Sequence, residues 1–258
     1  MIKTTKMEKA YHIGTSGWNY KGWKGKFYPP EVKEKEWLSF FLNHFDTVEI
    51  NNSFYQLPKP ETVSKWVASV PDHFRFCPKM NQYVTHMKKL KDVEQPLANF
   101  FNSFDHMSEK MGPVLVQLPK MTTFIPTKTE IFYTYLRDKY RDYAFAMEVR
   151  HESWASPESF DMMKEFNISW VISQSGVGWP YAEHVTAKDI YVRFHGPTAL
   201  YASFYEDDQL LYYANLFKEW IKQGHRVWAF FNNDIHGYAP VNAKRLNVMM
   251  EKELKIEN

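Results

Sequence analysis

Four β-rich segments of this sequence carry charged side chains where a plain core strand would be apolar. The segments are residues 48–51, 147–150, 192–195 and 230–234. A buried ionised group costs several kcal/mol unless it is paired or hydrogen-bonded, so central strands seldom carry such groups without a purpose. The positions of the charges therefore predict where a site lies better than they predict which reaction it performs.

Two carboxylates and an imidazole are the first candidates for chemistry. If Glu49, Glu148 and His195 converge, they can divide the roles of general acid and base, because burial raises one pKa while nearby cations lower another. With Asp234, the same groups could instead hold a divalent metal. The sequence has no H-x-x-x-H spacing, and neighbouring cations would repel a metal ion. We therefore predict no metal site and no cofactor, with a divalent metal as the weaker alternative.

Cations and amides accompany these candidates. Lys79, Arg150 and Arg193 point toward the same opening, and the planar fork of arginine suits carboxylate or phosphate, so we predict an anionic ligand. The alternative is that the cations only neutralise the nearby carboxylates. Side chains expected to orient or bind the substrate are Asn51, Gln117, Asn232 and Asp234.

Aromatic residues gather in or beside the loops of the same predicted face. Flat rings can stack on a base, contributing about 1–3 kcal/mol, and can pack against the C–H face of a sugar. Aromatic residues make up 17% of the chain, so any one ring could merely clamp a loop. The rings proposed as ligand contacts are Trp18, Tyr20, Tyr55 and Trp154, and Trp23, Trp179, Tyr201 and Tyr205 lie nearby.

Eight short β-rich segments, separated by longer segments of helical period, must position these residues. Leu210, Ala214, Phe217 and Ile221 form an apolar helical stripe, and Gly224 follows as a stop signal. Similar stripes occur in residues 37–45 and 97–107, whereas residues 174–187 have none and are predicted to form a long loop. The expected strands cover residues 12–16, 47–51, 74–79, 114–118, 144–150, 169–173, 190–195 and 226–232.

Eight βα units in a chain of 258 residues match the rhythm of a closed barrel. We predict an α/β protein with a single eight-stranded parallel (β/α)8 TIM barrel whose sixth βα unit is irregular. A doubly wound open sheet is the rival fold, but the first βα turn lacks G-x-G-x-x-G. The predicted barrel domain covers residues 11–250, with tails at 1–10 and 251–258.

Strand alternation turns the charged positions into a prediction about a pocket. In a barrel, successive side chains point alternately to the surrounding helices and to the barrel axis. If Val48 and Ile50 face helices, then Glu49 and Asn51 face the axis, and the same rule turns the other charged candidates inward. Barrel active sites lie at the carboxyl ends of the strands, where these residues fall.

Composition limits the class of protein and its partners. Formal charge is only +2, from 32 basic and 30 acidic residues, which does not favour nucleic acid as a partner. The single cysteine, Cys77, fits a reducing compartment and is expected in the core. The sequence shows no secretory signal and no apolar run of roughly 18 residues, so we expect a cytoplasmic protein without a membrane partner.

Ordered motifs run through nearly the whole chain: Gly14–Tyr20, Phe27–Pro29, Thr47–Tyr55, Pro60–Thr62, Gly112–Pro119, Glu148–Trp154, Tyr191–Gly196 and Phe231–Asp234. Together they resemble the YecE-like family, the domain of unknown function 72. The resemblance implies a TIM-barrel fold and no established activity. In residues 201–205, where the family often has Tyr-Arg-Gly-x-Tyr, this chain reads Tyr-Ala-Ser-Phe-Tyr, so a basic contact from that loop is not expected.

Three functional hypotheses follow from these residues. The first is an enzyme with hydrolase-like acid/base chemistry on a phosphate-bearing sugar or nucleotide-like substrate. In it a glutamate acts as the base and His195 donates a proton. The second is a non-catalytic module that binds an anionic metabolite or nucleic acid. The third is glycosidase-like chemistry through Glu49 and Glu148, or a metal-dependent sugar isomerase or phosphodiesterase.

Overall fold

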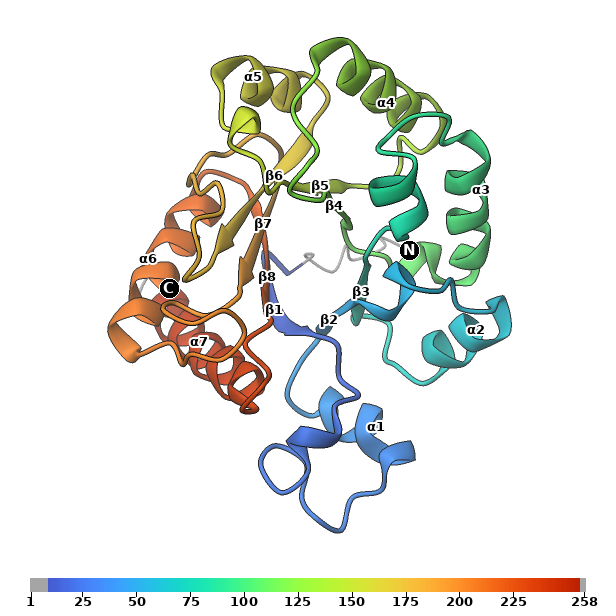
Figure 1. Cartoon of the computed structure of the whole chain (residues 1–258). Helices are drawn as coiled ribbons and strands as arrows, with labels where there is room; N and C mark the ends of the chain where they lie inside the picture. Colours follow the sequence, from blue (N-terminus) through green and yellow to red (C-terminus); the bar gives the residue numbers. More distant parts are fainter. Residues whose placement is uncertain (1–8, 256–258) are drawn as a thin grey trace, which may run out of the picture.

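Eight parallel strands curve into a nearly closed barrel with helices around it (Figure 1). The computed structural model describes residues 9–255. The strand order is β3-β2-β1-β8-β7-β6-β5-β4, so the first and last strands of the chain are neighbours, and β3 and β4 meet through the isolated bridges Phe76–Met111 and Lys79–Leu115. This arrangement confirms the predicted (β/α)8 barrel. The strands are β1 (Tyr11–Ser16), β2 (Thr47–Ile50), β3 (Arg75–Pro78), β4 (Val114–Gln117), β5 (Phe145–Glu148), β6 (Ile168–Gln174), β7 (Asp189–Phe194) and β8 (Arg226–Phe231).

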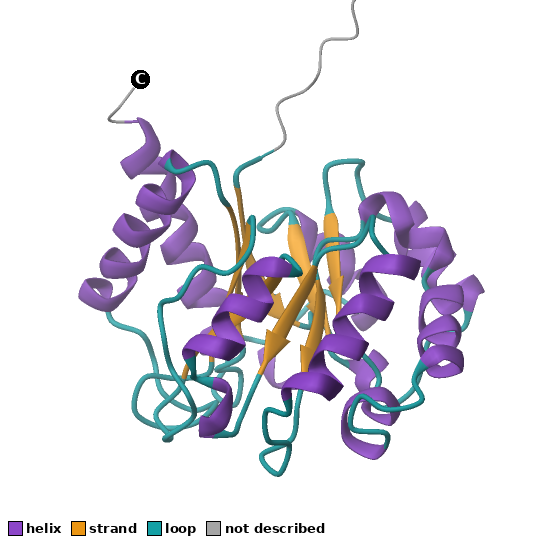
Figure 2. Ribbon diagram, turned by 90° about the horizontal axis from the view of Figure 1, so that it is seen from above, coloured by secondary structure: helices purple, strands orange, loops and turns teal. Residues whose placement is uncertain are grey.

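Helices cover the outer face of the strands, and loops that follow the carboxyl ends of the strands gather at one end (Figure 2). The predicted stop at Gly224 has the left-handed φ of +88° that glycine tolerates best. Residues 175–188, between β6 and β7, contain no helix, which confirms the irregular sixth unit. The α-helices are α1 (Trp37–Leu42), α2 (Pro60–Ala68), α3 (Glu94–Ser103), α4 (Pro126–Lys139), α5 (Pro157–Glu165), α6 (Asp207–Lys222) and α7 (Tyr238–Lys255).

The core has two apolar layers because strand side chains alternate. Val48, Met147 and Val192 belong to the large layer between the strands and the helices. A smaller cluster of buried residues has the opposite parity and fills the barrel interior. That cluster comprises Cys77, Leu115, Ala146, Val171, Tyr191, Trp228 and Phe230, which places Cys77 in the core as expected.

The described residues can be compared with the two predicted tails. Residues 1–8 and 256–258 lie outside the described residues. Helix α7 continues to Lys255, so the C-terminal tail predicted from residue 251 begins inside this helix. Among residues 9–255, none of the helices combines the length and the apolar character that crossing a bilayer requires.

Candidate functional site

A layer of charged side chains lies inside the barrel, between the apolar interior cluster and the carboxyl ends of the strands. Glu49 on β2, Glu148 on β5 and Arg193 on β7 have the inward parity that alternation predicts, and their exposed fractions are 0%, 0% and 2%. His195, just after β7, is also fully buried. The three predicted catalytic residues, Glu49, Glu148 and His195, therefore lie in one network.

Arg193 is the centre of this network because it binds both glutamates. Its Nε and Nη2 donate to Oε2 and Oε1 of Glu49 at 2.9 and 2.7 Å, and its Nη1 donates to Glu148 Oε2 at 2.7 Å. Glu49 also accepts hydrogen bonds from Ser16 Oγ at 2.7 Å and from the Tyr191 hydroxyl at 2.8 Å. Both oxygens of Glu49 are thus occupied by protein donors.

Glu148 and His195 form a carboxylate–imidazole pair. Glu148 Oε1 lies 2.9 Å from His195 Nε2, and the Asn232 amide Nδ2 lies 3.2 Å from His195 Nδ1. An amide nitrogen donates, so Nδ1 accepts and Nε2 carries the proton that reaches Glu148. Burial, with repulsion from Arg193, lowers the pKa of His195 to about 4, so the ring is neutral at pH 7.

Two neighbouring arginines determine the ionisation state of Glu148. Burial alone would raise the pKa of this carboxyl, but Arg150 and Arg193 hold it well below its usual value. Arg150 Nη2 lies 2.8 Å from Glu148 Oε1, and Ser173 Oγ donates to the same oxygen at 2.9 Å. Glu148 therefore stays ionised and can stabilise positive charge on His195.

Two cations lie closest to solvent. Arg150 is 8% exposed, and its guanidinium carbon lies 3.5 Å from the ring centroid of Trp179, which belongs to the irregular segment between β6 and β7. Half-buried Lys79 donates to Gln117 Oε1 at 2.6 Å. Burial, with repulsion from Arg193, lowers the pKa of Lys79 to about 8.

Asp234 and Tyr20 form a second, looser group beside the network. The Tyr20 hydroxyl donates to the backbone oxygen of Ser16 at 2.5 Å and also contacts Asp234. Burial raises the pKa of Asp234 to about 6, which outweighs the lowering by its own backbone N–H and by Tyr20. Asp234 is therefore a carboxyl that changes charge just below neutral pH.

Four further residues predicted for the site lie outside both groups. Strand β2 ends at Ile50, and Asn51 adopts helical dihedrals, so strand alternation no longer fixes its direction. Asn51 and Trp18 line a separate cavity of about 290 Å³, where the Asn51 amide oxygen has no hydrogen-bond partner. Tyr55 is 73% exposed. Trp154 is fully buried and donates to the Thr122 carbonyl at 2.9 Å, so its ring clamps a loop and offers no surface to a ligand.

Sequence reasoning missed several hydrogen-bond donors of the network. Ser16, Ser173 and Tyr191 all contact its glutamates, and each has the same inward parity as its charged neighbours. Their inward parity could have indicated these donors, but serine and tyrosine are common in strands and do not by themselves indicate a site. Trp179, expected only as one loop ring among many, covers Arg150 and lies edge-on to His195 at 5.1 Å.

The glutamates are poor candidates for a metal site in this arrangement. Arg150, Arg193 and hydroxyl donors occupy the oxygens that a cation would need. Within residues 9–255, no three histidine, cysteine, aspartate or glutamate side chains are grouped so that they could hold a metal ion.

Comparisons with known proteins place this barrel in a family. The UPF0759 protein YunF of Bacillus subtilis strain 168 is 26% identical over 273 aligned positions, which cover 94% of this chain and 95% of that protein. The UPF0759 protein YecE of Escherichia coli strain K12 is 31% identical over 114 residues, 44% of this chain, so the match spans only 41% of that relative.

Solved structures agree with the fold. A DUF72 family protein from Thermotoga maritima MSB8 matches with a TM-score of 0.84 at 27% identity, covering 94% of this chain and 100% of that chain. One from Enterococcus faecalis V583 matches with a TM-score of 0.80 at 21% identity, covering 93% and 95%. A profile described as "Protein of unknown function DUF72" matches residues 12–257, and the chain therefore belongs to this YecE-like family.

Proposed function

We propose that this protein is an enzyme that hydrolyses a small phosphate-bearing substrate, a sugar phosphate or nucleotide-like molecule, at the carboxyl ends of its strands. The observation that carries the proposal is the buried network of Glu49, Arg193, Glu148 and His195. Well-packed apolar side chains of similar volume often stabilise a fold as well as a buried ion pair does, or better. Fold stability alone therefore gives little reason for these charges.

The charge balance of the network supports an anionic substrate. Glu49 and Glu148 face the three cations Lys79, Arg150 and Arg193 at neutral pH. Arg193 is saturated by the glutamates, so in this proposal it positions them and does not contact the substrate. Arg150 and Lys79, which lie nearer solvent, bind the phosphate.

The acid and base roles follow from which groups are protonated at pH 7. In this proposal a water molecule displaces the Asn232 amide from Nδ1 of the neutral His195, gives that nitrogen a proton, and bonds through its oxygen to phosphorus. The bond from phosphorus to the leaving oxygen breaks, and Lys79, still protonated below pH about 8, gives that oxygen a proton. Glu148 stabilises the imidazolium that forms, as orienting carboxylates do in other sites.

This assignment differs from the roles expected from sequence. There, a glutamate accepted the proton and His195 donated one. Both oxygens of Glu49 and both oxygens of Glu148 are occupied by protein donors. The geometry therefore favours His195 as the proton acceptor.

Release of inorganic phosphate from a panel of sugar phosphates, nucleotides and p-nitrophenyl phosphate tests the proposal. His195→Gln should lower the rate by about 10²-fold or more, the range of a general base, while phosphate binding persists. His106→Gln, at an exposed histidine outside the network, is the matched control and should keep the wild-type rate. Lys79→Met and Arg150→Met should weaken binding of inorganic phosphate. Equal rates in wild type and His195→Gln would refute the catalytic role.

A specific observation also favours a non-catalytic binding module. Glu49 and Glu148 are fully buried and fully hydrogen-bonded, as expected of carboxylates that only hold Arg193 and Arg150 in place for an anion. Phosphate binding without release from any ester would support this function. Affinity for a single-stranded oligonucleotide that falls steeply with salt would identify nucleic acid as the ligand. Glycosidase chemistry loses support, because the Arg193 guanidinium bonds to both glutamates.

A further inference from the structure

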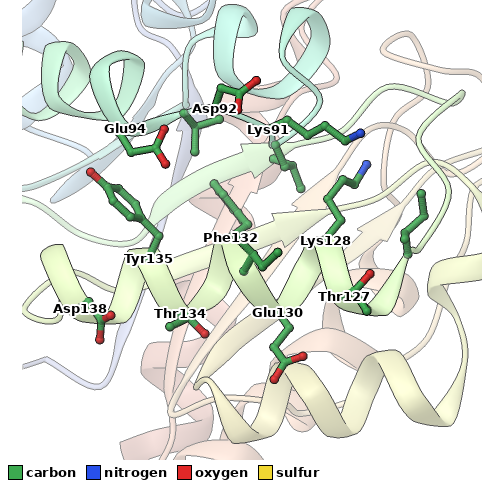
Figure 3. Close-up of a pocket in the computed structure, with 14 residues that line it drawn as sticks. Lys91, Asp92, Glu94, Thr127, Lys128, Glu130, Phe132, Thr134, Tyr135 and Asp138 are labelled. Atoms are coloured by element: carbon green, nitrogen blue, oxygen red, sulfur yellow. The ribbon is translucent and has the colours of Figure 1, made fainter.

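A second cavity lies outside the barrel, between residues 90–94 and helix α4 (Figure 3). Its volume is about 760 Å³. Small-molecule sites typically have about 300–1,000 Å³, so this cavity is large enough for a ligand of its own. None of the network residues Glu49, Glu148, Arg193 and His195 lines it.

The body of the cavity is apolar. Leu90, Val93 and Phe132 are buried in its walls. Ile125 and Ile131 also line it, with 44% and 71% of their surface exposed. Large aliphatic side chains left in solvent around a concave surface are typical of a site that an apolar group covers.

One end of the cavity is positively charged. Lys91 and Lys128 extend their ammonium groups toward the same point, while Glu94 and Asp138 lie toward the other end (Figure 3). Asp92 and Glu130 also line the cavity, and Glu130 turns away from residues 90–94. Burial, with repulsion from Lys91 and Lys89, lowers the pKa of Lys128. Within residues 9–255, neither Lys91 nor Lys128 forms an ion pair with a carboxylate.

Helix α4 adds to this positive end. Lys128 lies in its first turn, and the N-cap residue, Ile125, has no side chain that could accept a hydrogen bond from the first backbone N–H groups. A helix N-terminus carries partial positive charge, which disfavours a lysine there and favours an anion. The two ammonium groups and the partial positive charge of the helix N-terminus thus repel one another.

The backbone that presents Lys91 is unusual. Lys89, Leu90 and Asp92 have positive φ angles of 49°, 67° and 46°, a region that residues with a Cβ rarely occupy. Leu90 is 3% exposed, and its N–H donates to the Val84 carbonyl at 3.1 Å, which holds the turn in place. Such conformations concentrate at ligand clamps, where the surrounding structure enforces them.

We propose that this cavity binds a small amphipathic anion. The carboxylate, sulfonate or phosphate of the ligand lies between Lys91 and Lys128, and its acyl or aryl body lies along Leu90, Phe132 and Ile131. The acidic end formed by Glu94 and Asp138 repels a second anionic group, so the ligand carries charge at one end only. This site is separate from the proposed hydrolase site and does not depend on it.

Fluorescence titration with two naphthyl probes tests the proposal. The anionic probe is 1-anilinonaphthalene-8-sulfonate, and N-phenyl-1-naphthylamine supplies the same rings without the sulfonate. The double variant Lys91→Gln/Lys128→Gln should bind the sulfonate at least tenfold more weakly and bind the neutral amine as wild type does. Lys139→Gln, an exposed lysine on α4 that does not line the cavity, is the control and should leave both affinities unchanged.

Further measurements fix the location of the probe. Ile131→Asn, on the exposed apolar wall, should weaken both probes, and circular dichroism should show that each variant keeps its fold. Lys79→Met, which removes a cation of the barrel site that does not line this cavity, should leave the affinity for the sulfonate unchanged. Absence of saturable binding by wild type, wild-type affinity in the double lysine variant, or weakened sulfonate binding in Lys79→Met would each overturn the proposal.

Discussion

Replacing Arg193 with methionine tests the central structural argument, because methionine keeps much of the volume and removes the cation. The substitution deletes hydrogen bonds of 2.9 and 2.7 Å to Glu49 and of 2.7 Å to Glu148. Glu148 keeps Arg150 as a partner at 2.8 Å. Among the described residues, Glu49 keeps only the neutral donors Ser16 and Tyr191 as hydrogen-bond partners, so it becomes a buried carboxylate without a paired cation.

Removing one partner of a buried ion pair costs about 3–5 kcal/mol. For a chain of this size, each kcal/mol lowers the melting temperature by about 2–4 °C, so Arg193→Met should lose roughly 6–20 °C. Urea and thermal unfolding followed by circular dichroism measure both quantities. Arg245→Met is the control: Arg245 pairs with Asp207, which is 61% exposed, and such surface pairs contribute about 0–1 kcal/mol.

The double variant Arg193→Met/Glu49→Gln identifies the cause of the loss. It removes the uncompensated charge together with the cation, so it should be more stable than Arg193→Met alone. Lowering the pH should also reduce the difference in the free energy of unfolding between Arg193→Met and wild type. The pKa of Glu148 is lowered in the folded protein, so wild type loses the stability that this ionised carboxylate contributes as the pH falls. A loss as small as that of Arg245→Met, with no recovery in the double variant, would refute the reasoning.

The remaining predictions concern single groups. Binding of inorganic phosphate, measured by calorimetry, should weaken as the pH rises through about 8, where Lys79 loses its charge, and Lys79→Arg should abolish that weakening; an unchanged profile would contradict the role of Lys79. The raised pKa of Asp234, about 6, means that wild type loses stability as the pH rises from about 4 to 6, so Asp234→Asn should raise the melting temperature at pH 7.5 and have little effect at pH 4. Gly196→Ala should destabilise by more than about 2 kcal/mol, because its φ is +111° and an added Cβ would lie 2.4 Å from the Ala199 carbonyl oxygen. The control Gly25→Ala, with a φ of +78° and open space around it, should lose only about 1 kcal/mol, and equal losses would show that the contact is unimportant.

Strand alternation was enough to predict the main part of the candidate site. Glu49, Glu148 and Arg193 lie within regular strands, near their carboxyl ends, where the two-residue period still fixes which side chains face the axis. Asn51 shows where the rule stops, because β2 ends at Ile50 and the next residue turns into helical dihedrals. Strand ends depend on tertiary contacts that a local pattern does not contain.

The pairing inside the site could not be predicted. Sequence reasoning offered Arg193 as a contact for an anionic ligand or as a neutraliser of the carboxylates, and the structure gives it both glutamates as partners. That choice depends on distances of a few ångströms between strands far apart in the sequence. Trp154 fails as a ligand contact for a related reason, since the burial of a loop ring is decided by the segment that folds over it.

The hydrogen bond between Arg193 and Glu49 joins residues 144 positions apart, whereas Arg193 and Glu148 are 45 apart. Strands β5 and β7, which flank β6, supply Glu148 and Arg193, whereas the remaining guanidinium N–H groups are paired only when β2 takes its place in the barrel. A slip of β2 by one residue would set Val48 or Ile50 against those donors, and neither side chain accepts a hydrogen bond. The charge on Arg193 thus selects the correct register when the amino-terminal strands dock and the cylinder closes.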